Sequence, residues 1–114
     1  MYDRRISIVT PGTTTDGYSG VTVPDWATAT VTEVPFGVEV QPRMTTEDTD
    51  DGRRVFIQVG WRVISPPGHV IPLGDLDRIR VEGMADDLDV VGNPGTWEHT
   101  TMRHSEIDVE VARG

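Results

Sequence analysis

The sequence predicts an all-β fold, a small antiparallel β-barrel of about seven strands, and three observations lead to this prediction. Valine and threonine, which favour strands, recur along the whole chain. Residues 106–111 alternate between acidic and apolar side chains, as expected for a strand with one face on a core and the other in water. Turn signals separate short segments of this kind, and closure into a barrel would hide the edges of so small a sheet.

The first half of the chain contains four predicted strands, separated by residues that favour turns. Pro11 and Gly12 end the first strand, and residues 11–25, rich in Thr, Gly, Asp and Pro, are predicted to form a surface loop. Small apolar residues alternating with threonine predict the second strand, which Pro35 ends. These four strands are placed at residues 5–10, 27–34, 36–40 and 55–64. The fourth is the longest, and its alternating apolar side chains are expected to face the core: Val55, Ile57, Val59, Trp61 and Val63.

The second half contains three further predicted strands and a loop that carries a tryptophan. A hairpin around Gly83 joins the fifth strand to the sixth, and Pro94 and Gly95 belong to a loop over residues 93–105 that carries Trp97. The strands are placed at residues 77–82, 88–91 and 106–111. At 114 residues, the chain is expected to form a single domain, residues 1–114.

The composition excludes several classes of function. The chain has 10 Lys+Arg against 19 Asp+Glu, a formal charge of −9, which argues against binding nucleic acid through its phosphates. It has no cysteine, so neither a disulfide framework nor thiol chemistry is available. No apolar run approaches the roughly 20 residues that a membrane-spanning helix needs, and no signal peptide is expected.

Motifs for catalysis or metal binding are weak, and the chain is predicted to be no enzyme and to need no cofactor and no metal. His99 and His104 lie near Glu98 and Glu106, all residue types that zinc accepts, but they lack the spacing of a zinc motif. A calcium loop starting at Asp48 would need Gly at its sixth position and Glu at its twelfth. Those positions hold Arg53 and Val59, so the match fails.

The polar stretch over residues 42–54 is the feature that a plain barrel does not explain. It is too long for a tight hairpin and too polar to pack, and its Asp51-Gly52 is a hairpin-type turn signal. If the neighbouring strands extended into it, about six residues at roughly 3.3 Å each would carry its tip about 20 Å out of the domain. We therefore expect a projecting loop between the third and fourth strands, with an acidic tip: Glu47, Asp48, Asp50 and Asp51.

Two tryptophans near predicted loops have two interpretations. Trp26 and Trp97 either cover the mouth of the barrel or anchor a partner, since tryptophan is a frequent interface anchor.

Five segments, in this order, resemble the head-to-tail stopper (head-closure) proteins of long-tailed bacteriophages. The resemblance covers most of the chain from about Asp25 onward and departs from the family pattern at residues 83–89. The segments are VQPRMTTED (40–48), RRV (53–55), WRVISPPG (61–68), LDRIRVEG (76–83) and DVVGNPGTWEH (89–99).

The resemblance implies a structural virion protein that forms a homo-oligomeric ring, closes the DNA-filled head, retains the DNA and offers the tail its attachment surface. The implied partners are portal and adaptor proteins on the head side and a tail terminator or tail tube on the tail side. Double-stranded DNA would pass through the ring without sequence-specific binding, and no membrane is involved. The implied location is the virion, after assembly in the host cytoplasm.

In such a ring the long loop would point into the DNA channel, and charged patches would set the contacts between subunits. The expected channel residues are Arg43, Thr45, Thr46, Glu47, Asp48, Asp50 and Asp51. The expected subunit or partner interface consists of Arg4, Arg5, Trp26, Arg53, Arg54, Asp86, Asp87 and Trp97. Two alternatives remain: a small β-barrel module that binds a peptide or sugar through its tryptophan-bearing loops, or a related ring component such as a tail terminator.

Overall fold

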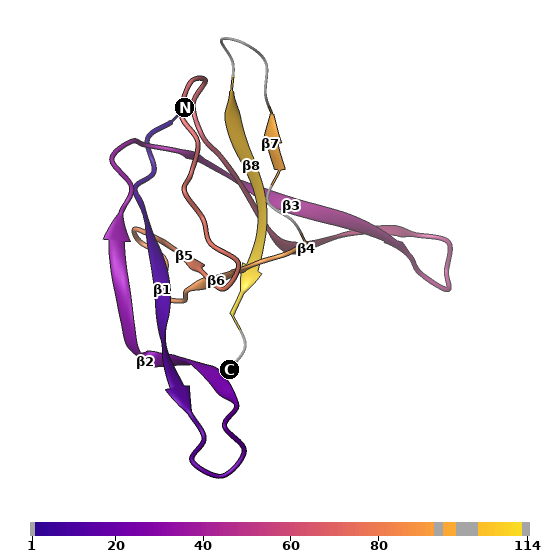
Figure 1. The fold of residues 1–114 in the computed structure, drawn as a ribbon. Coiled ribbons are helices and arrows are strands. Elements are labelled where there is room, and N and C mark those ends of the chain that lie inside the picture. Colours follow the sequence, from indigo (N-terminus) through magenta and orange to yellow (C-terminus); the bar gives the residue numbers. More distant parts are fainter. Residues whose placement is uncertain (1, 93–94, 98–102, 113–114) are drawn as a thin grey trace.

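The computed structural model describes residues 2–92, 95–97 and 103–112, and these residues form strands and turns without a helix (Figure 1). The all-β prediction is therefore confirmed. The strands are β1 (Ile6–Thr15), β2 (Thr22–Glu33), β3 (Glu39–Asp48), β4 (Arg54–Ile64), β5 (Arg78–Val81), β6 (Leu88–Val90), β7 (Gly95–Trp97) and β8 (His104–Val111). No helix that could span a membrane occurs in this part of the chain.

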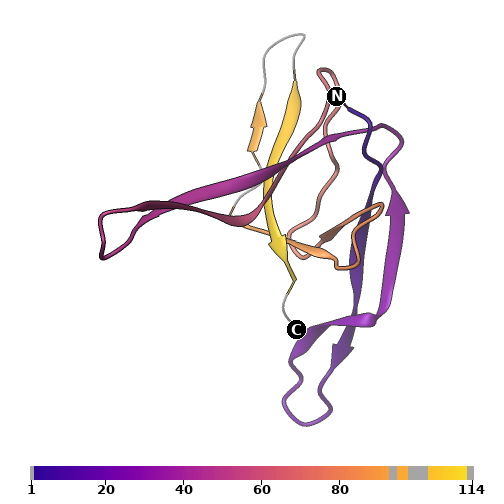
Figure 2. The ribbon, with the colours of Figure 1, turned by 180° about the vertical axis from the view of Figure 1, so that it is seen from behind.

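All strand pairs are antiparallel and belong to one sheet. Its order is β2-β1-β5-β6-β8-β4-β3, with β7 paired to β8 outside this path. The sheet curves like a barrel but does not close by a ladder. Among the described residues, one isolated bridge joins the chain ahead of β1 to the chain ahead of β3, where the Arg4 N–H donates to the Val38 carbonyl (3.0 Å) and the Val38 N–H to the Arg4 carbonyl (2.9 Å). The closed barrel expected from the sequence is thus an open one, because β2 and β3 diverge beyond this bridge (Figure 2).

The core lies inside the curve of the sheet and is purely aliphatic at its centre. Its fully buried side chains come from five strands and from the connections between strands: Ile6, Ile8, Val34, Val38, Val63, Ile71, Ile79, Val81, Leu88, Ile107 and Val109. The alternation predicted for residues 106–111 is confirmed at Ile107 and Val109. Val111 is 40% exposed, because β8 runs past the core at this end.

The segment 11–25, predicted to be a loop, is a hairpin, and this prediction is wrong. β1 continues to Thr15 and β2 begins at Thr22, where these two residues pair. The register shifts between Thr10 and Gly12, so Pro11, which cannot donate a ladder hydrogen bond, lies at an irregularity and does not end the strand. The hairpin extends below the body as one arm of the molecule (Figure 1).

The segment 42–54 projects as expected, as a second hairpin and not as a loop. β3 reaches Asp48 and β4 starts at Arg54, so only a five-residue turn, 49–53, connects them. Both views show this hairpin leaving the body sideways (Figures 1 and 2). The two arms raise the Cα radius of gyration to 16.8 Å, whereas a compact domain of this length has about 13 Å.

Candidate interaction site

The β3–β4 arm, which we define as residues 43–60, separates from the body at a glycine. Among the described residues, β4 pairs with β8 only from Trp61 to Ile64, and beyond that point it pairs with β3 alone. Gly60 has a φ of 154°, and a Cβ there would collide with the carbonyl oxygen of Val109 on β8. The register between β3 and β4 shifts at the same place, between Arg43 and Met44. A bulge of this kind bends a strand, so the arm turns away from the sheet here.

Charged side chains hold the root of the arm. The Arg62 Nε donates to Asp108 Oδ1 at 2.8 Å, and the Arg43 Nε lies 4.0 Å from the same oxygen. The hydrogen bond from Arg62 lowers the pKa of Asp108, and it raises the pKa of Arg62 in turn. The Arg43 Nε is buried without a hydrogen-bond partner among the described residues. Arg43, expected on the channel loop, therefore lies at the root of the arm.

The arm exposes apolar side chains that the sequence analysis assigned to the core. Val55, Ile57 and Val59 are 37–41% exposed. Phe56 on β4 is 68% exposed and Met44 on β3 is 50% exposed. Of the predicted core face of β4, only Val63 is fully buried and Trp61 is half-buried. The pairing of β4 with β8 ends at Trp61, so the curved body of the sheet does not cover the part of β4 beyond Gly60.

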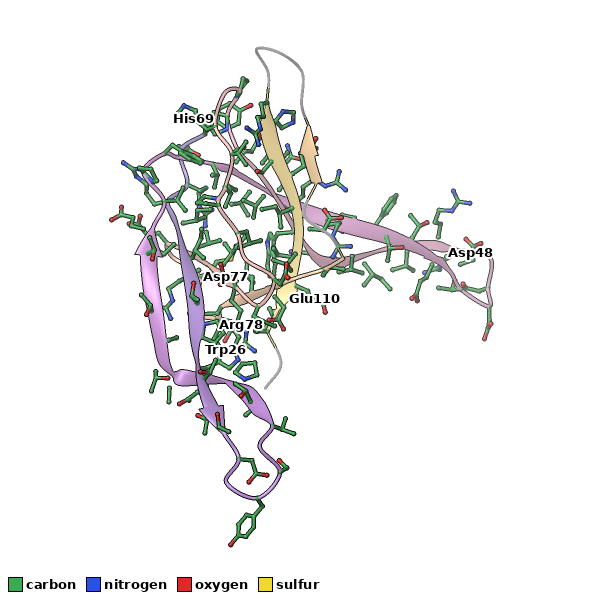
Figure 3. All side chains as sticks on the ribbon, in the orientation of Figure 1. Trp26, Asp48, His69, Asp77, Arg78 and Glu110 are labelled. Carbon is green, nitrogen blue, oxygen red and sulfur yellow. The ribbon has the colours of Figure 1, made fainter. Side chains whose placement is uncertain are left out.

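The turn of the arm is acidic and ordered by its own hydrogen bonds. The Thr49 N–H donates to the Arg53 carbonyl at 2.7 Å, and Gly52 has the positive φ (81°) that this turn requires. The Thr49 hydroxyl donates to the carboxylate of Asp51 and lowers its pKa. The expected channel residues Thr45, Thr46, Glu47, Asp48, Asp50 and Asp51 are all exposed here. Figure 3 shows Asp48 near the outer end of the arm.

The predicted basic and acidic interface patches do not meet within one chain. Arg53 and Arg54 lie at the acidic turn, 3.4 Å from Asp51 and 3.5 Å from Asp48. The other members lie on or near the body. Arg4 donates to the Glu82 carbonyl at 3.3 Å, Arg5 and Asp86 are exposed, and Arg80 donates to Asp87 at 2.8 Å.

The two tryptophans that the sequence placed near loops belong to strands, Trp26 to β2 and Trp97 to β7. Trp26 stacks against Arg78, whose Cζ lies 3.7 Å from the ring centroid (Figure 3). Arg78 is also 2.8 Å from Asp89, so Trp26 attaches the root of the β1–β2 hairpin to the β5–β6 hairpin. The side chain of Trp97 lies outside the described residues.

The histidines do not form a common site in the described part of the chain. His104 lies 3.2 Å from Glu106, and His69 packs on Phe36 with 4.8 Å between ring centroids. His99 and Glu98 lie outside the described residues. Among the described residues, no group of three or more His, Cys, Asp or Glu side chains could hold a metal ion.

An open hollow at the root of the arm was not predicted from the sequence. It measures about 390 Å³ and is lined by Gln58, Val59, Gly60, Trp61, Glu110 and Val111. It forms where β4 leaves β8, so both strands contribute half-covered side chains. The sequence signal for it was Gly60, the single glycine inside the long β4 strand.

Comparison with known proteins identifies no relative. No family model, no curated protein and no solved structure matches this chain.

Proposed function

We propose that this chain is a structural protein of a bacteriophage head–tail connector, in which a ring of copies closes the DNA-filled head and receives the tail. The observation that carries the proposal is the β3–β4 arm. It leaves the body as a two-stranded ribbon, exposes apolar side chains along β4 and ends in an acidic turn. The ordered resemblance of the segments to head-to-tail stopper proteins supports the same assignment.

A lone two-stranded ribbon in water is marginally stable, and exposed strand edges invite pairing with other chains. We therefore expect neighbouring chains to cover this arm when the protein assembles. In a ring, each subunit contacts the next through two different surfaces, and the assembly closes at a fixed number of copies. The arm of one subunit and the body of the next would supply such a pair of surfaces.

The acidic turn has a direct consequence for DNA in the passage of such a ring. Glu47, Asp48, Asp50 and Asp51 repel phosphates, so the turns would obstruct DNA sterically without binding it. DNA would be retained by the arms while the passage is narrow and would slide without sticking once it opens. On the head side the ring would contact portal or adaptor proteins, and on the tail side the terminator or tube.

The test neutralises the turn with four substitutions, Glu47→Gln, Asp48→Asn, Asp50→Asn and Asp51→Asn. We expect the variant to fold, to enter particles at the wild-type level and to change the fraction of particles that retain DNA or the rate at which they release it. The control variant removes the same charge from four exposed carboxylates away from the arm, at Asp3, Glu33, Asp75 and Glu82. Equal DNA retention and release in wild type and in both variants, or a defect of the turn variant in folding alone, would contradict the channel role.

A further inference from the structure

We infer that Phe56 on the arm of one copy docks into the hollow at the root of the arm of a second copy. The inference rests on the proposed function in one respect, that the chain assembles with itself in a ring. It adds the contact that joins neighbouring copies. Two surfaces of the same chain carry it, which we call the Phe56 knob and the Trp61 hollow, the latter being the cavity lined by residues 58–61, 110 and 111.

Phe56, the knob, is the most exposed large apolar side chain on the arm, at 68%. No charged residue occurs between Arg54 and Arg62, so the whole outer part of β4 offers an uncharged surface. An aromatic ring buries about 150–250 Å² when it is covered, and aromatic side chains are frequent hot spots of interfaces. An uncharged strand with one unpaired edge is also the kind of segment that associates when nothing covers it. Phe56 thus favours a protein partner.

The lining of the Trp61 hollow is partly apolar and partly polar. Val59, Trp61 and Val111 contribute apolar surface, and the carboxylate of Glu110 is exposed beside them. The acidic Glu110 disfavours a nucleic acid at this place. Half-buried apolar side chains beside a polar rim are the usual arrangement of a contact between proteins.

The knob does not fill the hollow of its own molecule. Phe56 is absent from the lining of the hollow and is 68% exposed. Trp61 lies five residues farther along β4, about 16 Å away at roughly 3.3 Å a residue. Contact therefore requires two molecules. Because each copy carries one knob and one hollow, the contact is head-to-tail, and repeated contacts of this type close into a ring when the rotation between copies permits.

The accessible surface of the isolated chain is large enough to leave room for two such contacts on each copy. The chain exposes 7,769 Å², whereas a compact protein of its mass exposes about 6,200 Å². The excess is roughly 1,600 Å². One partner contributes about 800 Å² to a standard interface, so the excess matches one interface on each side of a ring subunit.

The experiment traps the contact in the purified full-length chain, with Phe56 itself retained. Thr46 is the cross-strand partner of Phe56, so Thr46→Cys places a thiol beside the knob, and Glu110→Cys places one at the hollow. The natural chain has no cysteine, so every cross-link must join introduced thiols. The two variants are mixed in equal amounts, and a short bismaleimide is added. The matched control replaces Thr46→Cys by Thr15→Cys, an exposed threonine near the end of the other hairpin.

We expect the Thr46→Cys and Glu110→Cys mixture to give about tenfold more 46–110 cross-linked dimer than the control gives of 15–110 dimer. Adding Phe56→Ser to the Thr46→Cys variant should reduce the yield to the control level, while circular dichroism shows that the variant stays folded. The inference is wrong if the yield equals the control, if it survives Phe56→Ser, or if 46–46 dimers predominate, which would indicate arm-to-arm pairing.

This experiment and the test of the proposed function can fail separately. Cross-linking uses the purified chain without phage particles. If it fails, the docking contact is wrong, and microscopy of particles still tests whether the chain belongs to the head–tail connector. If the cross-link forms but the chain is absent from particles, the docking contact stands and the proposed function falls.

Discussion

Gly60 is the residue at which β4 stops being part of the body and becomes part of the arm. Its backbone passes so close to β8 that a Cβ would collide with the Val109 carbonyl oxygen, and its φ of 154° is one that other residues rarely adopt. We expect Gly60→Ala to lower the free energy of unfolding by about 2–4 kcal/mol. Thermal or urea denaturation followed by circular dichroism measures the change.

Gly17→Ala is the control for this substitution. Nothing lies within 4 Å of a Cβ at Gly17, and its φ is not positive, so the alanine fits there. A Gly60→Ala protein as stable as the Gly17→Ala protein would show that the close approach of β4 to β8 is not present in solution.

Asp108 predicts a pH dependence of stability at the root of the arm. The hydrogen bond from Arg62 lowers the pKa of Asp108 in the folded state below its value in the unfolded chain, which is about 3.9. The stabilisation is therefore fully present above pH 4 and is lost as the pH falls through the lower, folded-state pKa. We expect Asp108→Asn to cost about 1 kcal/mol at pH 7, since the pair is partly exposed.

Urea denaturation of wild type and Asp108→Asn at pH 7 and at pH 2.5 measures this difference. The gap between the two proteins should shrink at pH 2.5, because the unfolded wild-type chain has taken up a proton there that Asp108 in the folded chain binds less readily. Asp75→Asn, on an exposed aspartate of the body, is the control for the change in charge. An equal gap at both pH values would show that Asp108 acts through packing and not through its charge.

At the scale of the elements, alternation in the sequence predicted strands well and burial less well. Ile107 and Val109 alternate in β8 and are buried, whereas Val55, Ile57 and Val59 alternate in the same way in β4 and are exposed. Alternation shows which side chains share a face of a strand. Whether another strand covers that face depends on where the sheet ends, which here is decided by a contact between Gly60 and β8, far apart in the sequence.

Turn residues were a better guide to the β3–β4 arm than to the β1–β2 hairpin. The acidic turn around Gly52 lies where Asp51-Gly52 predicted it, although the flanking strands run farther than expected. Pro11 and Gly12 predict the end of a strand, but β1 passes through them by shifting its register against β2. A single sequence does not distinguish a bulge from a strand end, because both use glycine and proline.

At the scale of the whole molecule, shape and charge support one account. An open, curved sheet with a small aliphatic core carries two projecting hairpins. Their exposed strands give the chain more accessible surface than a compact protein of the same mass has. The net charge of −9 and the acidic turn suit a protein that surrounds DNA without holding it. Two of the segments that resemble head-to-tail stoppers, residues 40–48 and 53–55, belong largely to the arm, so the resemblance and the shape of the arm concern the same part of the chain.

Electron microscopy of assembled phage particles that encode this chain tests the central proposal most directly. The reconstruction should show a ring of copies between the head and the tail, with each β3–β4 arm against the next subunit and each acidic turn toward the DNA passage. Particles that lack the chain, or a ring in which the acidic turns face away from the passage, would contradict the account.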